Sequence, residues 1–543
     1  MKKPILFTIL LAILLPLCAG IGDTLVVQTF TFDDIEKRRD FFEFPNDART
    51  WEKIYLYRTL KCDEQTKQDK YPCGEWDYST FTLLYIPVGD TVEVFELENF
   101  VTPYGMRLDL NGDCGWTFIY DVTDYASLLR GKVEISSGNQ QELLDMKFIF
   151  VEGVPPRNVI SIKNLYPWGS YKYGDIADDN VLQPFELILD SKARGYMLRA
   201  RISGHGHHGP RNCCEWDRKT HTYYANEGVL FRWNIWKNCG DNPIYPQGGT
   251  WQFDRAGWCP GTAVDTYDFE LTNKVNPGDT LMFDYGIEMY SDNGEKGGEF
   301  RQCHQLFSYS KPNFNLNAEI YDIIAPSDKD SYSRINPICS NPEIVIRNSG
   351  KYPLKTLTIE YGLRTEEKHT YQWYGNLEFL KKENIILPNI NWKSDDSIFV
   401  VEIFNPNGQP DEYPNNNIMT SNVVELQILP SHFYLHIKAQ GLGRAKDNAY
   451  TLSDDVGRIL YMKDYFDDNE IYEELIELPA GCYELKITDR KEDGMIRHWW
   501  YRNSNPELVG ENGMIEILDE NKKLLKKLNY DFAESEIFRF RVE

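Results

Sequence analysis

Short runs of β-branched and aromatic residues recur along most of this chain, and turn-forming residues bound each of them. The runs 24–32, 53–57 and 80–86 are early examples. Such runs are typical of strands, because branched and aromatic side chains pack well on a pleated surface. Only 122–129 shows a helical pattern, and that pattern covers one or two turns. The sequence therefore predicts an all-β protein.

The spacing of the predicted strands divides the chain into modules. A chain of 543 residues is too long for a single hydrophobic core. Residues 23–155 and 156–314 each predict a β-sandwich of about eight strands. Residues 315–430 alternate around an Asn-Ser-Gly turn and predict an immunoglobulin-like module. Residues 431–543 predict a further β-sandwich module.

The charge balance argues against one class of binding partner. The formal net charge is −25, and no patch of Lys and Arg stands out along the chain. Nucleic-acid binding needs such patches to neutralise phosphates, so the sequence predicts no nucleic-acid partner. The 34 Tyr and 13 Trp favour strands and aromatic binding surfaces instead.

The N-terminus is typical of a secretory signal peptide, which we place at 1–22. Two lysines precede an apolar run at 5–17 that is too short to span a bilayer. No other run approaches the roughly 20 apolar residues of a membrane span. Cys18 raises the alternative of a lipoprotein, but Leu17 before it is not the small residue that lipidation needs. We expect an exported bacterial protein that is periplasmic, associated with the outer membrane, or secreted.

Export makes the ten cysteines beyond Cys18 candidates for disulfides. Cys62 with Cys73 closes a short polar loop, and Cys239 with Cys259 closes a longer one, so both are plausible bridges. The sequence alone leaves six cysteines unpaired: Cys114, Cys213, Cys214, Cys303, Cys339 and Cys482.

Two loops share the pattern Cys-x-Glu-Trp-Asp and are the strongest candidates for a reactive site. One is Cys73-Gly-Glu-Trp-Asp77, and the other is Cys213-Cys-Glu-Trp-Asp217 within the dense loop 204–221. The repetition suggests that the loops face one another across a domain interface. Asp77 and Glu215 would then form a carboxylate pair suited to acid–base hydrolysis. The alternatives are a turn-capping Asp and a surface Glu.

Aromatic residues and one arginine accompany these carboxylates. Trp76 and Trp216 would exclude water and offer faces on which sugars stack. A third cluster, Asp254-Arg-Ala-Gly-Trp-Cys259, supplies Arg255 and Trp258, and Trp258 would line the substrate cleft with Trp76 and Trp216. An arginine there can keep a carboxylate ionised and aligned. The alternatives are core packing for each Trp and a surface ion pair for the Arg.

Histidines at 205, 207, 208 and 221 invite a metal interpretation, because imidazoles on an extended segment can share an ion. The first module contains no histidine, so we predict no metal and assign His207 to hydrogen bonding with the substrate. A carboxylate-rich loop at 489–494 could bind calcium, although such turns are usually solvated. No cofactor is predicted.

These residues resemble the bacterial peptide-N-glycosidase F family over about 24–312. Eight runs match in order and with suitable spacing: Cys73-Gly-Glu-Trp-Asp77, Phe100-Val-Thr-Pro-Tyr104, Asp121-Val-Thr-Asp-Tyr-Ala-Ser-Leu-Leu129, Ile202-Ser-Gly-His-Gly-His207, Cys213-Cys-Glu-Trp216, Arg218-Lys-Thr-His-Thr222, Asn242-Pro-Ile244 and Asp254-Arg-Ala-Gly-Trp-Cys-Pro-Gly261.

The resemblance implies two eight-stranded antiparallel jelly-roll sandwiches side by side. It implies cleavage of the amide between Asn and the first N-acetylglucosamine of an N-linked glycan, with N-glycosylated proteins or peptides as substrates. Asp77 falls on the family's key catalytic Asp, Glu215 on its second essential carboxylate, and Arg255 on the Arg that supports that Glu. The bridges Cys62–Cys73 and Cys239–Cys259 fall on family disulfides.

Several positions depart from the family pattern. A third acidic residue is missing near 136–140, where Gly138 is the equivalent position and Glu142 is a possible substitute. Tyr78 replaces an Arg, and His205 replaces a Trp. Asp217 replaces the second cysteine of a short bridge, so we expect Cys213 or Cys214 to pair elsewhere or stay free.

Two other functions stay open at this point. One is a copper-dependent peptide monooxygenase of the same two-sandwich architecture, with His205 and His207 as a ligand pair. The other is a non-catalytic glycan-binding protein that has lost its site. By analogy, the two C-terminal modules are expected to contact a partner, a glycan or the cell surface.

Overall fold

The structure, a computed structural model, describes residues 22–34, 36–62, 73–74, 77–138, 144–289, 297–392 and 396–543. The predicted signal peptide lies outside this range except for Gly22, as do Trp76 and Glu142. Strands dominate throughout, and the one α-helix in the described ranges is α1 (Tyr173–Ala177). The predicted helical pattern at 122–129 contains only the 3-10 turn η3 (Thr123–Tyr125). The prediction of an all-β fold is confirmed.

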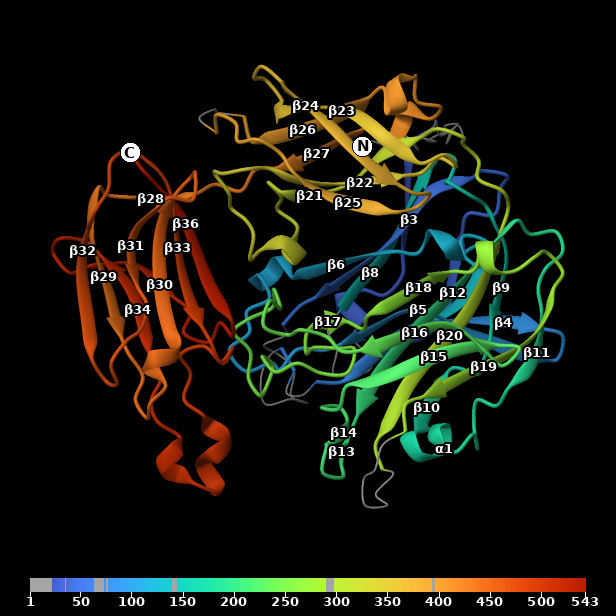
Figure 1. Ribbon diagram of the computed structural model, residues 1–543, viewed down its shortest axis with the longest axis horizontal. Helices are drawn as coiled ribbons and strands as arrows, with labels where there is room; N and C mark the ends of the chain where they lie inside the picture. The colour runs from blue at the N-terminus through green and yellow to red at the C-terminus, as the bar shows by residue number, and fades with distance from the viewer. Residues whose placement is uncertain are drawn as a thin grey trace, which may run out of the picture.

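The first sandwich packs two antiparallel sheets face to face (Figure 1). Its first sheet has the order β1-β8-β3-β6, with bounds Thr24–Gln28, Leu144–Glu152, Trp51–Leu60 and Trp116–Asp121. Its second has the order β2-β7-β4-β5, with bounds Arg39–Phe44, Gly131–Ser137, Ser79–Val88 and Thr91–Val101. This alternation of strands between two sheets is the jelly-roll arrangement. The inward side chains of both sheets form one aromatic core that includes Phe44, Phe100 and Phe148.

The second sandwich repeats this topology. One sheet has the order β10-β20-β12-β18, with bounds Gly169–Lys172, Glu299–Tyr309, Gly195–His205 and Thr266–Glu270. β9 (Val159–Asn164) pairs with the far end of β20, so β9 and β10 act as one interrupted edge strand. The facing sheet has the order β11-β19-β15-β16, with bounds Phe185–Ile188, Thr280–Ile287, Lys219–Ala225 and Gly228–Ile235. The strand order therefore matches that of the first sandwich, as predicted for a jelly-roll pair.

The two sandwiches are joined by backbone and side-chain bonds. β17 (Thr262–Ala263), which follows a long loop of the second sandwich, adds to the edge of β5 in the first. Buried polar contacts extend this joint, because the Trp168 indole donates to Glu96 Oε2 at 2.7 Å and the Tyr125 hydroxyl donates to Gln305 Oε1 at 2.6 Å. The joint therefore fixes the loop before β17 against the strands that follow Asp77.

A third sandwich lies over the first two (Figure 1). Its smaller sheet has the order β21-β22-β25, with bounds Ala318–Ala325, Glu343–Asn348 and Lys382–Ile386. Its larger sheet has the order β24-β23-β26-β27, with bounds His369–Leu377, Leu354–Leu363, Ile398–Phe404 and Ile418–Asn422. Two sheets of three and four strands are the arrangement of immunoglobulin-like sandwiches.

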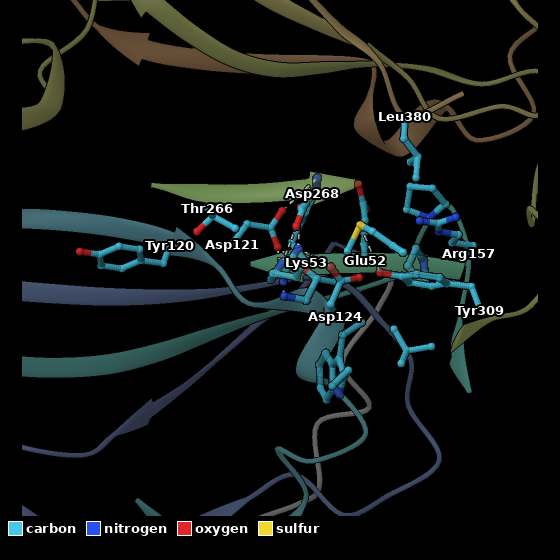
Figure 2. Close-up of a pocket in the computed structure, with 18 of the residues that line it drawn as sticks. Glu52, Lys53, Tyr120, Asp121, Asp124, Arg157, Thr266, Asp268, Tyr309 and Leu380 are labelled. Carbon is cyan, nitrogen blue, oxygen red and sulfur yellow. Dashed lines mark hydrogen bonds and ion pairs between the residues drawn. The ribbon is translucent and has the colours of Figure 1, made fainter. Parts of the chain in front are cut away.

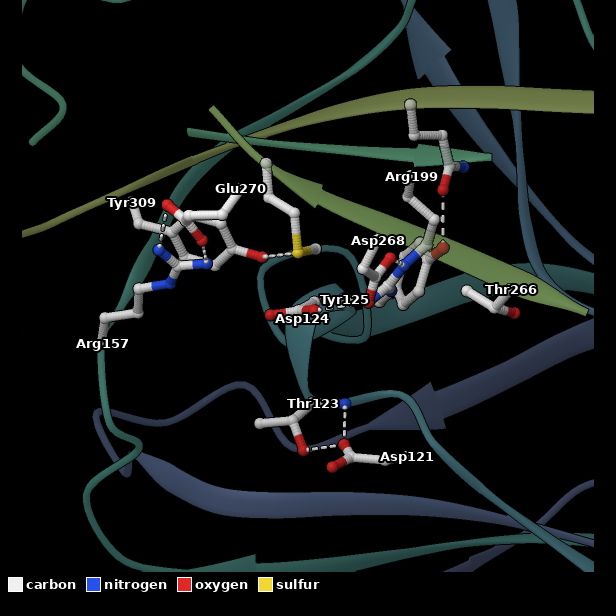
Figure 3. Close-up of polar contacts among 12 residues, drawn as sticks. Asp121, Thr123, Asp124, Tyr125, Arg157, Arg199, Thr266, Asp268, Glu270 and Tyr309 are labelled. Atoms are coloured by element: carbon white, nitrogen blue, oxygen red, sulfur yellow. Dashed lines mark hydrogen bonds and ion pairs between the residues drawn. The ribbon is translucent and has the colours of Figure 1, made fainter. Parts of the chain in front are cut away.

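A polar cavity of about 640 Å³ lies where the first three sandwiches meet (Figure 2). Arg199 bridges Asp268 at 2.7 Å and Asp124 at 3.0 Å, and it joins the first sandwich to the second (Figure 3). Lys53 pairs with Glu319 of the third sandwich at 3.2 Å. Because buried charges need partners, these pairs fix how the sandwiches sit together. The lining of the cavity contains none of the carboxylates singled out above.

The fourth module lies to one side and contacts the long loop of the second sandwich (Figure 1). One sheet has the order β28-β36-β33-β30-β31, with bounds Gln427–Leu429, Ser535–Val542, Gly481–Asp489, Asn448–Asp454 and Ile459–Lys463. The other has the order β32-β29-β34-β35, with bounds Ile471–Glu477, His432–Lys438, Met514–Leu518 and Leu524–Leu528. The module boundaries given above stay predictions.

Among the residues that the structure describes, four cysteines form no disulfide: Cys114, Cys303, Cys339 and Cys482. Cys339 of the third-module loop and Cys482 of the fourth module lie together, and a hydrogen bond from Cys339 lowers the pKa of the Cys482 thiol to about 7. No helix within the described ranges is long and apolar enough to cross a membrane.

Candidate active site

Asp77 lies at the joint between the first two sandwiches, two residues before β4. The disulfide Cys62–Cys73 closes the loop that leads to it. Gly105 packs on this loop so closely that an added Cβ would lie 1.6 Å from the Gly74 carbonyl oxygen. Protein surrounds Asp77 on most sides, and part of its surface stays open to solvent. Gly74 is therefore closely packed, and the Asp77 carboxylate keeps a path to a substrate.

The environment of Asp77 raises the pKa of its carboxyl to about 6. Burial is the largest cause, and the nearby Glu215 carboxylate adds to it. The Arg255 guanidinium and a hydrogen bond from Tyr104 act in the opposite direction. Opposed effects of this kind produce a carboxylate that gains and loses a proton near neutral pH, as a general base does.

Glu215 and Arg255 form an ion pair that the second sandwich holds in place. Arg255 Nε lies 3.0 Å from Glu215 Oε1, and the arginine is completely buried. Its other donors bond to the carbonyl oxygen of Phe253 at 2.6 Å and to the carbonyl and hydroxyl oxygens of Thr250 at 2.8 and 2.9 Å. Every arm of the guanidinium is thus engaged, which fixes the direction of the Glu215 carboxylate.

The backbone around Glu215 is equally constrained. Its amide donates to the Gly206 carbonyl at 3.2 Å, and its own carbonyl accepts from Ala256 at 2.9 Å. Gly204 packs against this segment, where an added Cβ would lie 2.0 Å from the Cys214 carbonyl oxygen. The disulfide Cys239–Cys259 closes the loop that carries Arg255. Both members of the ion pair therefore sit on cross-linked loops.

The expectation for Cys213 and Cys214 was wrong. We expected one of them to pair elsewhere or stay free, and the structure bonds them to each other directly before Glu215. Both are fully buried in the core of the second sandwich. The sequence alone did not predict this bond, because each of the two cysteines could equally pair with other cysteines of the chain.

Tyr104 is a site residue that sequence reasoning did not assign. Its hydroxyl bonds to the Asp77 carboxylate, and burial together with the Asp77 charge raises the pKa of the phenol. It is therefore a neutral donor at physiological pH. Its backbone amide donates to Gln247 Oε1 at 3.0 Å. Tyr104 ends one of the runs shared with the family, and that was the available signal.

Trp216 and His207 form the exposed side of the Glu215 site. The Trp216 indole donates to His207 Nδ1 at 2.8 Å, and the Arg255 guanidinium lies 4.4 Å from the Trp216 ring centroid. Because an indole only donates, Nδ1 of His207 must accept, and the proton of the neutral ring sits on Nε2. His207 Nε2 lies 3.3 Å from Glu215 Oε2, the oxygen that Arg255 leaves open.

We expected Trp258 to line the cleft, but the structure buries it. It is 2% exposed, its indole donates to the Gly204 carbonyl at 2.8 Å, and His205 stacks on it. It lies beneath Arg255, with 5.0 Å between its ring centroid and the guanidinium. In this position the Trp258 ring packs against the Arg255 guanidinium and holds it in place. Trp76 lies outside the described residues.

The four histidines of loop 204–221 do not gather at one point. Burial lowers the pKa of His205 to about 3, and its Nε2 bonds to the Ser203 hydroxyl at 2.8 Å. His221 lies in the core of the second sandwich and bonds to the Tyr285 hydroxyl at 2.6 Å. Across the ranges that the structure describes, no three His, Cys, Asp or Glu residues are grouped to hold a metal ion.

The position of the missing third acidic residue is also defined in part. Ser136 and Ser137 end β7, and the Gly138 amide donates to the Phe81 carbonyl at 3.3 Å. Gly138 has no side chain, so this position supplies no carboxylate. Glu142, the suggested substitute, lies outside the described residues.

Comparisons with known proteins give the family that this chain is similar to. Residues 172–310 match the family model described as peptide-N-glycosidase F, C terminal. A curated relative, peptide-N(4)-(N-acetyl-beta-D-glucosaminyl)asparagine amidase F of Elizabethkingia miricola, is 29% identical over 296 residues, which are 51% of this chain and 79% of the relative.

Solved structures were also compared. A crystal structure of peptide-N(4)-(N-acetyl-beta-D-glucosaminyl)asparagine amidase is 26% identical and covers 53% of this chain and 96% of its own, with a TM-score of 0.45. PNGase F, a glycosylasparaginase from Flavobacterium meningosepticum, has the same identity and coverage with a TM-score of 0.43. On the family model and the curated relative, this chain resembles peptide-N-glycosidase F.

Proposed function

We propose that this protein is an amidohydrolase that releases N-linked glycans from glycoproteins or glycopeptides by cleaving the Asn side-chain amide. The observation that carries the proposal is the placement of Asp77. Its carboxyl has a pKa of about 6, accepts from Tyr104, and lies within electrostatic reach of the Glu215–Arg255 pair on the facing sandwich. The resemblance to peptide-N-glycosidase F supports the same reaction.

In the proposed reaction, water adds across the C–N bond of the glycosylated Asn side chain. Ionised Asp77 accepts a proton from the water, whose oxygen bonds to the side-chain carbonyl carbon. The C–N bond breaks, and the nitrogen leaves on the sugar with a proton. The products are an Asp residue and a glycosylamine, so atoms and charges balance.

Glu215 and Arg255 are proposed to hold the first sugar rather than to transfer protons. Arg255 fixes Glu215 Oε1, so Oε2, which faces His207 Nε2 at 3.3 Å, has a further lone pair that can accept from a sugar hydroxyl. Tyr104 keeps the Asp77 carboxylate oriented as a neutral donor. Trp216, half-buried beside them, offers an apolar face to a sugar ring.

The proposed setting is outside the cytoplasm. Three disulfides lie in the two sandwiches that carry the site. Disulfides persist in oxidising compartments, where N-glycosylated proteins would also be met.

The copper-monooxygenase alternative needs His205 as a metal ligand. His205 bonds to Ser203 and stacks on Trp258, so the structure gives that alternative no support from this residue.

The direct test is incubation of the purified full-length protein with an N-glycopeptide, followed by mass analysis of the peptide. The expected result is loss of the whole glycan with conversion of Asn to Asp. Release of the glycan with Asn or N-acetylglucosaminyl-Asn left on the peptide would show a different bond specificity and contradict the proposal.

A further inference from the structure

The fourth module reaches the candidate active site through a row of aromatic rings. Trp216, beside Glu215, lies 6.3 Å from Phe253 between ring centroids. Phe253 in turn lies 5.7 Å from Trp500 of η9 (Trp499–Asn503) in the fourth module. All three rings are half-buried, so each keeps part of its surface open. The row leads away from the carboxylates onto a module that the family resemblance does not cover.

The fourth module is fixed to the site loop by contacts other than this row. The Trp251 indole donates to Asp531 Oδ1 at 3.0 Å, and Trp251 is fully buried. The Tyr245 hydroxyl donates to Glu536 Oε2 at 2.7 Å, and its ring packs on the core of the module. Both residues belong to the loop that carries Thr250 and Arg255. The position of the aromatic segment relative to Glu215 is therefore set by a firm interface.

The aromatic segment does not serve the core of its own module. The hydrophobic core of the fourth module includes none of Trp499, Trp500 and Tyr501, and no residue of η9 is buried. Instead, His498 stacks on Trp500 at 4.4 Å, and its Nε2 lies 2.9 Å from Asp493 Oδ2. A cluster of half-exposed aromatic rings that neighbouring side chains hold in place is typical of a binding surface.

We propose that Trp500, with Trp499 and Tyr501 beside it, forms a carbohydrate subsite for the outer sugars of the N-glycan whose first residue lies at Asp77. This inference rests on the proposed function. The C–H faces of pyranose rings stack on aromatic side chains, and polar groups at the edge of the subsite, such as the Asp493–His498 pair, suit sugar hydroxyls.

A carbohydrate fits this segment better than an extended peptide. A peptide that binds by adding a strand to a sheet needs an open strand edge. Here the segment is a 3-10 turn, and its Trp499 and Tyr501 amides already donate to the carbonyls of Arg497 and His498. The exposed faces of the aromatic rings are therefore the surface of this segment that a ligand can contact.

The test uses one glycosylated peptide prepared in three forms, with a single N-acetylglucosamine, with a short core, and with a complete neutral glycan. For the full-length Trp500→Ala variant we expect kcat/KM to fall about tenfold on the complete glycan, and to be unchanged on the single-sugar form. Trp499→Ala should show a smaller loss with the same pattern. Tyr465→Ala, an exposed ring on the same module, is the matched control and should equal the parent protein on all three substrates.

Each other outcome overturns the subsite. An equal loss on all three substrates would mean that Trp500 only supports the site loop. An unchanged kcat/KM on the complete glycan would mean that Trp500 does not contact the outer sugars.

The proposed function is judged separately. If the parent protein cleaves none of the three substrates, that proposal fails. In that case the subsite is judged by titrating the free complete glycan into the parent protein and into the Trp500→Ala variant. Equal binding to both, or no binding to either, overturns the subsite too.

Discussion

The two Cys-x-Glu-Trp-Asp loops have the same sequence pattern, and the structure uses them in opposite ways. In the first loop the final residue, Asp77, is the recessed carboxylate beside Tyr104. In the second loop the equivalent residue, Asp217, is 3% exposed and held by Arg211 at 2.5 Å and Lys219 at 2.6 Å. The carboxylate that faces the site there is Glu215, two positions earlier. The same sequence pattern thus supplies the proposed reactive carboxylate in one loop and a buried ion pair in the other.

The difference follows from the neighbours that each fold places around the loop. Cys73 bonds back across a loop to Cys62, and Asp77 comes just before a strand at the sandwich joint. Cys214 bonds to Cys213, and the buried Lys219 of β15 lies next to Asp217. A cation in contact with a buried carboxylate forms an ion pair with it, as at Asp217. Arg255 acts on Asp77 through the longer-range attraction between their charges.

Asp77→Asn should give the largest effect. An amide cannot accept the proton from water, so we expect kcat/KM to fall by at least about 1,000-fold. Glycan release from a denatured glycoprotein measures this loss. An Asp90→Asn variant in an exposed turn is the control and should keep full activity.

The same Asp77→Asn variant should also be more stable than the parent at neutral pH. Because the folded-state pKa of Asp77 is raised to about 6, its ionised form destabilises the folded protein above pH 6, and this penalty disappears as the pH falls below about 4. A shift of about two pKa units corresponds to at most roughly 3 kcal/mol. Thermal unfolding at pH 7.5 and pH 4 checks it, and a variant less stable than the parent at pH 7.5 would contradict the buried-charge argument.

Glu215→Gln should reduce kcat/KM by roughly 100-fold. The amide keeps the shape but loses the charge that pairs with buried Arg255 and the free oxygen proposed for a sugar hydroxyl. Steady-state kinetics with a glycopeptide measure the change. A loss confined to kcat, with KM unaltered, would argue against a sugar-holding role.

Asp217→Asn tests the other half of the comparison. It leaves Lys219 buried without its counter-charge, so unfolding should become easier by roughly 3–5 kcal/mol. The folded protein should keep activity within a few-fold of the parent, because Asp217 does not face the site. Denaturant unfolding and assays at low temperature separate the two effects. An activity loss as large as that of Asp77→Asn would show that the loops are functionally equivalent after all.

The pH dependence tests the role of Asp77 without any substitution. Since the reaction needs ionised Asp77, kcat/KM should fall about tenfold per unit below pH 6 and be level above it until another group titrates. A profile on a glycopeptide between pH 4 and pH 8 measures this. A level rate down to pH 4 would place the working carboxylate elsewhere.

Much of the fold and part of the site followed from local patterns. Period-two runs and turns predicted strands correctly, because those signals act over a few residues. The disulfides Cys62–Cys73 and Cys239–Cys259 join cysteines close in sequence, and both are present. The Cys213–Cys214 bond was missed, since spacing alone does not choose among partners once the chain folds.

The sequence by itself determined the all-β class, the division into sandwiches, and the carboxylates and arginine worth testing, because strand patterns and motif residues are local. Only the tertiary structure decided which carboxylate of each repeated loop faces the site. It alone brought Tyr104 to Asp77, buried Trp258 beneath Arg255, and carried Trp500 from the fourth module to Phe253. The Tyr104–Asp77 and Trp500–Phe253 contacts join residues more than twenty positions apart, so they depend on how whole sandwiches pack, and no short stretch of sequence contains that information.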